Sequence, residues 1–250
     1  MYSKVEPGVS DLLSIEVATL FVLAESGRIH RENDADRSPG PRLYLAGCES
    51  GNIARLRHDV GDETARAITA LVADEPPLRD PDSTPLHLDD YVALLAREAP
   101  VERQSAGLTY SFPDQFAYEH DVTAVSSDTP GGELLLGRLA KEGMPQTLTA
   151  LGFVATTDIW APWCIALHKG EVASIALTAR IGPTGAEVGV STVPALRGRG
   201  FAAAAVAGWA SLPSLYGRAL FYSTDRTNVS SRRVTDRLSL RFIATSLRLT

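Results

Sequence analysis

The run from Thr192 to Ala202 (TVPALRGRGFA) has the composition of an anion-binding loop. It holds two arginines, two glycines and no acidic residue, and it lies between a strand-like stretch, 188–193, and an alanine-rich stretch, 202–210. A loop between a strand and a helix points several backbone N–H groups at one spot, at the positive end of the helix dipole. Glycine suits this loop because a Cβ would hold an anion away from the backbone. The run therefore predicts a site for a diphosphate group.

Two motifs in this part of the chain resemble those of the GNAT acetyltransferase superfamily. The sequence Arg197-x-x-Gly200-x-Ala202 fits the Arg/Gln-x-x-Gly-x-Gly/Ala signature of that family. The residues before it resemble the family's Val-x-Pro-x-x-Arg-Gly lead-in, with Thr192 at the usual valine position. The later segment 228–240 (NVSSRRVTDRLSL) is similar to the helix that closes the fold. Two motifs in the right order are more specific than either alone. The resemblance covers the C-terminal part of the chain and does not extend to the N-terminal part.

The resemblance implies acetyl-CoA as co-substrate and assigns residues to it. Backbone N–H groups of the loop would hold the pyrophosphate, and the main chain near Thr192 and Val193 would pair with the pantetheine like an extra strand. Asn228 and Ser231 would face the pantetheine or thioester end, and Asn228 is also a natural N-cap for a helix over 229–238. The acetyl-CoA site so predicted consists of Thr192, Val193, Arg197, Gly198, Arg199, Gly200, Phe201, Ala202, Asn228 and Ser231.

Glu187 is the candidate catalytic residue. Many members of the family place a glutamate on the strand before the glycine loop, where it acts as general base toward the attacking amine, and Glu187 is the candidate in that strand. Common members have this glutamate eleven residues before the signature arginine, whereas Glu187 lies ten before Arg197. Because strand side chains alternate between faces, the shift could turn Glu187 away from the cleft.

The general acid has no family counterpart here. Members often carry a tyrosine six or seven residues after the asparagine, and those positions are Val234 and Thr235. Either another hydroxyl, that of Tyr222 or Ser223, protonates the thiolate, or the thiolate leaves unaided.

The leading hypothesis is transfer of an acetyl group from acetyl-CoA to a primary amine of a small molecule, and two other functions compete with it. A non-catalytic acyl-CoA sensor would explain the shifted glutamate and the missing tyrosine. A dinucleotide-binding oxidoreductase is suggested by Gly198-x-Gly200-x-x-Ala203, with Asp225 as a ribose-binding acid. Against it, residues 194–197 separate the strand from the first glycine, and too little chain follows Asp225 for a nicotinamide half.

Composition and charge narrow the classes of protein and of partner that the sequence allows. The chain has 250 residues, of which 44% are hydrophobic and 22% charged, as in ordinary globular proteins, and a net charge of −6. We expect no nucleic-acid partner because there is no basic stripe. Only Cys48 and Cys164 occur, which excludes a disulfide framework and fits the cytoplasm. The histidines lack metal-ligand spacing, and the apolar stretch 15–24 is too short to span a bilayer. We therefore expect no metal and no membrane partner, but a small-molecule amine substrate and, as the assembly to test, a homodimer.

The elements that must position these residues follow from periodicity and turn signals. In the C-terminal part we expect strands at 163–167, 171–179, 186–193, 220–224 and 242–249, and helices at 202–210 and 229–238. In the N-terminal part we expect helices at 10–25, 62–73, 88–98 and 133–141 and strands at 42–46, 52–58, 108–112 and 123–125. The expected fold class is α/β (α+β), a GNAT fold with a mixed, mostly antiparallel sheet whose central strands splay, flanked by helices. The expected domains are 1–145, an α/β region or a divergent GNAT-like half, and 146–250, the acetyl-CoA-binding catalytic domain.

Overall fold

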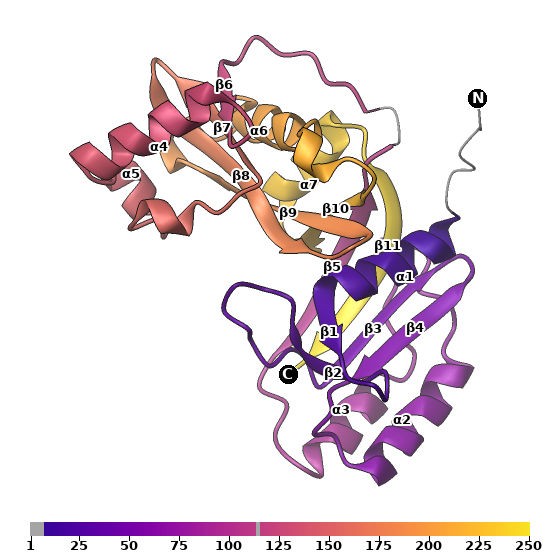
Figure 1. Cartoon of the computed structure of the whole chain (residues 1–250). Coiled ribbons are helices and arrows are strands. Elements are labelled where there is room, and N and C mark those ends of the chain that lie inside the picture. Colours follow the sequence, from indigo (N-terminus) through magenta and orange to yellow (C-terminus); the bar gives the residue numbers. More distant parts are fainter. Residues whose placement is uncertain (1–7, 114–115) are drawn as a thin grey trace.

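The computed structural model describes residues 8–113 and 116–250, and Figure 1 shows their arrangement. The helices are α1 (Val9–Leu20), α2 (Asp62–Asp74), α3 (Leu88–Ala96), α4 (Pro130–Glu142), α5 (Gln146–Thr149), α6 (Phe201–Ala210) and α7 (Val229–Arg237). The strands are β1 (Phe21–Leu23), β2 (Ile29–Glu32), β3 (Leu43–Cys48), β4 (Gly51–Leu56), β5 (Gln104–Ser111), β6 (Ala124–Ser126), β7 (Trp163–His168), β8 (Glu171–Ile181), β9 (Gly185–Thr192), β10 (Ala219–Asp225) and β11 (Arg241–Leu249).

Within the described residues, nine strands form one continuous sheet in the order β4-β3-β11-β5-β10-β9-β8-β7-β6, and β1 and β2 form a separate ribbon. Neighbours in the large sheet are antiparallel except β9 and β10, which are parallel. The expected fold class, a mixed and mostly antiparallel sheet flanked by helices, is confirmed. A dinucleotide-binding domain needs a mainly parallel sheet, so this topology removes the oxidoreductase alternative.

The order of elements from β7 to β11 is the one expected from the sequence, with ends shifted by one or two residues. The β7–β8 turn has Lys169 and Gly170 at φ of 55° and 83°, the left-handed pair that a two-residue hairpin requires. Near the N-terminus the expected helix over 10–25 is present, but its expected end at residue 25 is wrong. Helix α1 ends at Leu20, and the next residues form β1, because the aromatic and β-branched side chains at 21–22 suit a ladder with β2.

Strands from distant parts of the sequence lie side by side in the middle of the sheet. Strand β5 lies between β10 and β11, and β11 continues the sheet to β3 and β4. Figure 1 shows β5 and β11 running from the end of the molecule that holds α2 and α3 toward the end that holds α6 and α7. The sheet therefore crosses the expected division after residue 145, and that division stays a prediction.

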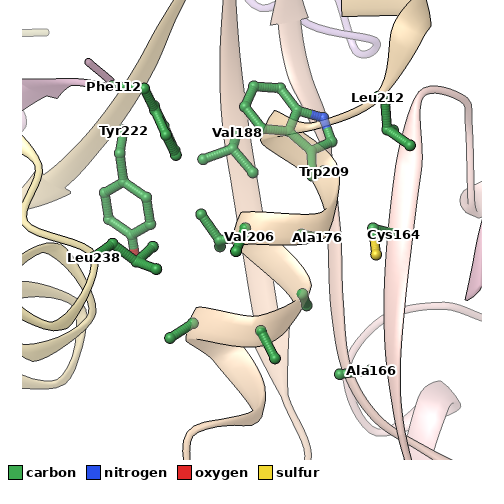
Figure 2. Packing of buried hydrophobic residues seen from close by; sticks show 14 of the residues in the cluster. Phe112, Cys164, Ala166, Ala176, Val188, Val206, Trp209, Leu212, Tyr222 and Leu238 are labelled. Carbon is green, nitrogen blue, oxygen red and sulfur yellow. The ribbon is translucent and has the colours of Figure 1, made fainter. Parts of the chain in front are cut away.

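One face of the sheet is covered by α6, which packs on β7, β8 and β9. Small side chains allow the close approach: Ala203, Ala204 and Ala205 are buried, and a Cβ on Gly208 would lie 2.4 Å from the Cys164 sulfur. Figure 2 shows this core, with Trp209 and Cys164 on either side of the helix end. Burial raises the pKa of the Cys164 thiol to about 12, so this thiol is a packing group rather than a nucleophile.

The opposite face is covered by α1. Its apolar side chains pack with residues of β3, β10 and β11 in a cluster that includes Leu13, Val17, Phe21, Phe221 and Ile243. No helix of the described residues combines the length and the apolar character needed to cross a bilayer. Residues 8–113 and 116–250 also contain no group of three or more side chains placed to bind a metal ion.

Candidate acyl-CoA site

Strands β9 and β10 separate part of the way along their length. Their parallel pairing ends at the Phe221–Glu187 register, although β9 continues to Thr192. Val193 N–H donates to a carbonyl of β8. Because successive strand residues point their backbone groups to opposite edges, Val190 and Thr192 present theirs to the gap. The splay that the resemblance implies is therefore present. Along its β9 side the Thr192 carbonyl accepts from Arg197 Nε at 3.4 Å, and the other edge groups of Val190 and Thr192 have no backbone partner among the described residues.

The loop between β9 and α6 keeps its backbone N–H groups free. Gly198 and Gly200 have φ of 76° and 91°, left-handed values that favour glycine, and Gly200 is the N-cap of α6. Among the described residues, no acceptor pairs with any N–H from Gly198 to Ala203; the first bond of this helix end runs from Ala204 N–H to Gly200 C=O. The first turn also has no acidic side chain. These bare donors and the positive end of the helix dipole can bind an anion.

A cavity of about 810 Å³ lies over the gap and the loop. Residues of β9, β10, the start of α6 and α7 line it. Val193 and Arg199 do not: Val193 is buried, and the Arg199 guanidinium lies over the Phe201 ring, 5.5 Å from its centroid. The predicted acetyl-CoA residues that line the cavity are Thr192, Arg197, Gly198, Gly200, Phe201, Ala202, Asn228 and Ser231.

Two arginines that the family motifs do not assign also line the cavity, Arg233 and Arg237. They lie four residues apart on α7 and so project from one face of that helix. Arg237 reaches the loop so closely that a Cβ on Gly200 would lie 2.8 Å from its Nη1 atom. With Arg197 they put positive charge beside the free N–H groups. Their helical spacing in the segment 228–240 is the sequence signal that could have identified them.

Asn228 caps α7. Its side-chain oxygen accepts a hydrogen bond from Ser231 N–H at 3.1 Å, so the predicted N-cap is confirmed. Both residues also line the cavity, and the cap therefore fixes the position of this part of the cavity wall.

Tyr222 of β10 carries a hydroxyl without a partner. The residue is only 2% exposed and lines the cavity. Its hydroxyl makes no hydrogen bond of ordinary geometry in the part of the chain that the structure describes, and the nearby Ser231 side chain only partly offsets the effect of burial on its pKa. Burial raises the pKa of Tyr222 above its ordinary value, so the phenol is protonated at neutral pH. A buried polar group left unpaired is costly, and this hydroxyl therefore points to a partner that a ligand supplies.

Glu187 lies on the opposite face of the sheet from the cavity. Its neighbour Val188 packs with α6, and successive strand residues face opposite ways. The Glu187 carboxylate accepts a hydrogen bond from Arg180 Nη1 at 2.6 Å. A bulge in β8 between Thr178 and Arg180 explains this contact: Thr178 bonds Trp209 on the α6 side, and the extra residue turns Arg180 to the other face. Glu187 does not line the cavity, and its catalytic role stays a prediction.

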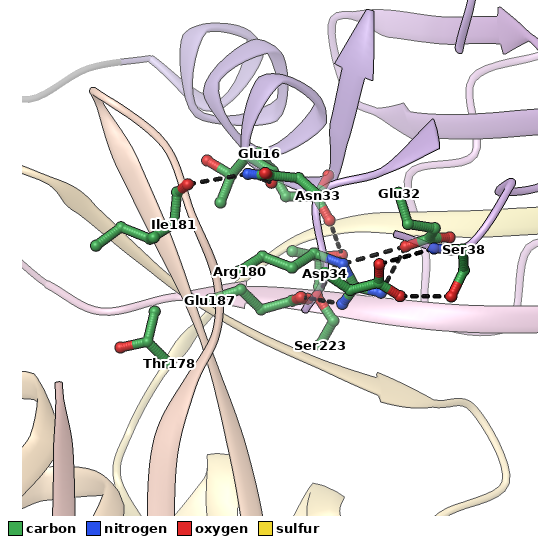
Figure 3. A network of polar contacts seen from close by, with 12 residues as sticks. Glu16, Glu32, Asn33, Asp34, Ser38, Thr178, Arg180, Ile181, Glu187 and Ser223 are labelled. Atoms are coloured by element: carbon green, nitrogen blue, oxygen red, sulfur yellow. Dashed lines mark hydrogen bonds and ion pairs between the residues drawn. The ribbon is translucent and has the colours of Figure 1, made fainter. Parts of the chain in front are cut away.

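An ion-pair network of buried carboxylates and half-buried arginines surrounds Glu187 (Figure 3). Arg180 also donates to Glu32, from Nη2 at 2.6 Å and from Nε at 3.1 Å. Arg248 of β11 donates to the other oxygen of Glu32 at 2.8 Å. Two arginines thus balance two carboxylates between α1, the β1–β2 ribbon and the large sheet.

A third carboxyl group, that of Glu16 on α1, lies beside this network. Its Oε1 accepts from the Thr109 hydroxyl at 2.9 Å and its Oε2 from the Tyr44 hydroxyl at 3.1 Å. Burial, and then the charge of Glu187, raise the pKa of Glu16 from 4.5 to about 7. In the sequence Glu16 is only an interruption of an apolar stretch, because its partners come from β3 and β5, far along the chain.

Comparison with known proteins gives relatives by structure alone, because no protein-family model and no curated protein matches the chain. An acetyltransferase of the GNAT family from Colwellia psychrerythraea is 13% identical over 98% of both chains, with a TM-score of 0.44. A putative GNAT acetyltransferase from Novosphingobium aromaticivorans is 24% identical over 60% of this chain and 65% of its own, with a TM-score of 0.41; the chain thus spans slightly less than two thirds of that protein. A tandem GNAT protein from the clavulanic acid biosynthesis pathway is 13% identical over 78% of this chain and 73% of its own, with a TM-score of 0.40. The chain is similar to GNAT acetyltransferases in fold, and its function has to be inferred from the site.

Proposed function

We propose that this protein is an acetyltransferase that moves an acetyl group from acetyl-CoA to a primary amine of a small molecule. The observation that carries the proposal is the row of N–H groups from Gly198 to Ala203, which have no acceptor among residues 8–113 and 116–250. This row lies at a cavity of about 810 Å³ beside the β9–β10 gap. A cavity with bare amides at one end and an open strand edge at the other suits a long ligand with a diphosphate and an amide-bearing arm.

The residues present fit acetyl-CoA. The loop amides would hold the pyrophosphate, and Arg197, Arg233 and Arg237 would add charge to the phosphate end. The edge of β9 at Val190 and Thr192 would pair with the pantetheine amides as an added strand would. When bound, acetyl-CoA supplies an acetyl group activated as a thioester.

Tyr222 would protonate the leaving thiolate. Its hydroxyl is buried, unpaired in the described residues and part of the cavity wall next to the gap. Its raised pKa keeps the proton on the oxygen until a strong base, such as a thiolate in a site with little water, accepts it.

A non-catalytic acyl-CoA sensor is the second candidate. It is favoured by one observation: Glu187 is bound by Arg180 at 2.6 Å and lies outside the cavity, so no carboxylate of β9 faces the bound thioester. Both candidates bind acetyl-CoA, and only the enzyme releases free CoA faster when an amine is present.

The test has two steps. Calorimetry first measures the binding of acetyl-CoA, CoA and NAD; we expect the first two to bind and NAD not to bind. Release of the CoA thiol is then followed with a panel that contains a diamine, an aminosugar, an amino-acid amide and an aromatic amine. Acceleration by a member of the panel supports the enzyme. Binding without acceleration by any amine would favour the sensor, and absence of acetyl-CoA binding would contradict both.

We place the reaction in the cytoplasm. The two cysteines, Cys48 and Cys164, are both free and buried, which suits a reducing compartment. The acceptor is proposed as a small amine because the charge of −6 favours a cationic substrate over an acidic one.

A further inference from the structure

A chain of side-chain hydroxyls connects the buried Glu16 carboxyl to the β9–β10 gap. Thr109 of β5 donates to Glu16 Oε1 at 2.9 Å, and the Thr109 and Ser223 hydroxyl oxygens lie 3.4 Å apart. Thr109 and Ser223 are direct partners across the antiparallel β5–β10 pair, so their side chains share a face of the sheet. Figure 3 shows Glu16 and Ser223 around the same network as Glu187 and Arg180.

Ser223 is placed where the gap begins. It lies two residues beyond Phe221, the last β10 residue paired with β9, and it directly follows Tyr222, which lines the cavity. Unlike Glu16 and Thr109, which are 1% exposed, Ser223 is only half-buried. A group that enters the gap from the face opposite to the cavity would therefore contact Ser223 before it contacted Thr109 or Glu16.

Counting protons fixes the direction of the hydrogen bonds when Glu16 is ionised. A carboxylate only accepts, so Thr109 and Tyr44 both donate to it. Thr109 has a single hydroxyl proton, and the Thr109–Ser223 bond must then be donated by Ser223. The Ser223 oxygen is left as an acceptor toward the gap, which is the polarity that an incoming N–H group needs.

We propose that Ser223, Thr109 and Glu16 form a proton relay that takes a proton from the acceptor amine. This inference rests on the proposed function. The amine N–H proton passes to Ser223 Oγ, the Ser223 proton passes to Thr109 Oγ1, and the Thr109 proton passes to Glu16 Oε1. One proton moves from nitrogen to carboxylate, both hydroxyls are regenerated, and no bond between heavy atoms changes. After the product leaves, the same path returns the proton to water.

The charges around Glu16 suit a group that gains and loses a proton near neutral pH. Glu187 on β9 repels its charge, Arg248 on β11 attracts it, and Tyr44 on β3 and Thr109 on β5 donate to it. Burial dominates and raises the pKa of Glu16 to about 7, close to the value at which a general base is most effective. Glu187 is less suited, because its carboxylate already accepts a hydrogen bond from Arg180 at 2.6 Å.

The first measurement needs no substrate. Infrared difference spectra of the whole protein are recorded between pH 5 and 9, and the carbonyl band of a protonated carboxylic acid is followed. We expect a band that disappears with a midpoint near pH 7 in the wild type and is missing in Glu16→Gln. A band that persists in Glu16→Gln, or the lack of such a band in the wild type, would overturn the relay.

The second measurement separates a relay from a structural role. With the fastest amine of the panel, Thr109→Val, which keeps the shape but removes the hydroxyl, should lower kcat at least tenfold and abolish the inflection of the kcat profile near pH 7. Thr109→Ser, which restores a hydroxyl, should recover both. The matched control is Thr245→Val, which removes another buried hydroxyl whose hydrogen bond goes to Asp80 C=O; the inflection should stay.

The outcomes distinguish the relay from the function on which it rests. If Thr109→Val keeps the wild-type pH profile, or if Thr109→Ser is as slow as Thr109→Val, the relay is wrong while acetyl transfer stands. If the wild type neither binds acetyl-CoA nor releases thiol, the proposed function is wrong, and the infrared titration still reports on Glu16.

Discussion

Substitution of Gly200 by alanine probes the loop at its most sensitive position. Gly200 has φ of 91°, and the added Cβ would lie 2.8 Å from Arg237 Nη1. A side chain in this left-handed region costs about 1–2 kcal/mol, and the stiffer unfolded chain returns about 0.4–1 kcal/mol of it. We therefore expect the free energy of unfolding to fall by about 1 kcal/mol, because Arg237 is long enough to move aside.

The effect on CoA binding should be larger than strain alone explains. The new methyl group lies among the free amides and displaces Arg237, so at least one charge-assisted hydrogen bond to a phosphate is lost. Such a bond is worth about 1.5–3 kcal/mol, which corresponds to a Kd about 10- to 100-fold higher. Calorimetric titration with CoA measures this change, and urea unfolding measures the stability.

Gly217→Ala is the matched control. Gly217 has φ of 84°, no atom of the described residues lies within 4 Å of a Cβ added there, and it does not line the cavity. The Gly217→Ala variant should show the same fall in the free energy of unfolding as Gly200→Ala and should keep wild-type affinity for CoA. If the two variants bind CoA equally well, the loop does not hold the phosphates and the reasoning is refuted.

Further predictions concern the proposed acid, a strained residue after α7 and the buried carboxyl groups. Tyr222→Phe should lower the rate of thiol release without lowering the free energy of unfolding, because the lost hydroxyl makes no hydrogen bond of ordinary geometry in the described residues; an unchanged rate would remove Tyr222 as the acid. Ser239→Gly should raise the free energy of unfolding by about 1 kcal/mol, as measured in urea, because Ser239 sits at φ of 52° after α7. Arg180→Met should lower it by about 3–5 kcal/mol, since it leaves the buried Glu187 carboxylate unpaired. Glu16 has a pKa of about 7 in the folded protein, above its ordinary value of 4.5. Its contribution to the free energy of unfolding is therefore complete below pH 4.5, and about 3 kcal/mol is lost as the pH rises through 7. Urea unfolding of Glu16→Gln across this pH range should show no such loss.

The sequence was sufficient to predict those elements whose conformation depends on neighbouring residues. The strand before the loop, the glycines at 198 and 200 and the alanine-rich helix α6 follow from backbone preferences within about twenty residues of chain. The Lys169-Gly170 hairpin and the Asn228 cap are local for the same reason.

The sequence was not sufficient to predict strand order and side-chain contacts that depend on segments far apart in the chain. The insertion of β5 between β10 and β11 depends on packing between strands more than 100 residues apart, which no local pattern encodes. The partner of Glu187 depends on a neighbouring strand as well, because the bulge in β8 turns Arg180 to the face of the sheet on which Glu187 lies. The Glu16–Thr109 contact has the same origin, since it joins residues 93 positions apart.

The most direct measurement is a crystal structure of the protein with acetyl-CoA. We expect pyrophosphate oxygens within hydrogen-bond distance of the N–H groups between Gly198 and Ala203, the pantetheine along the open edge of β9, and the thioester between Tyr222 and Ser223. A diphosphate bound elsewhere, or an acetyl group directed away from the β9–β10 gap, would contradict it.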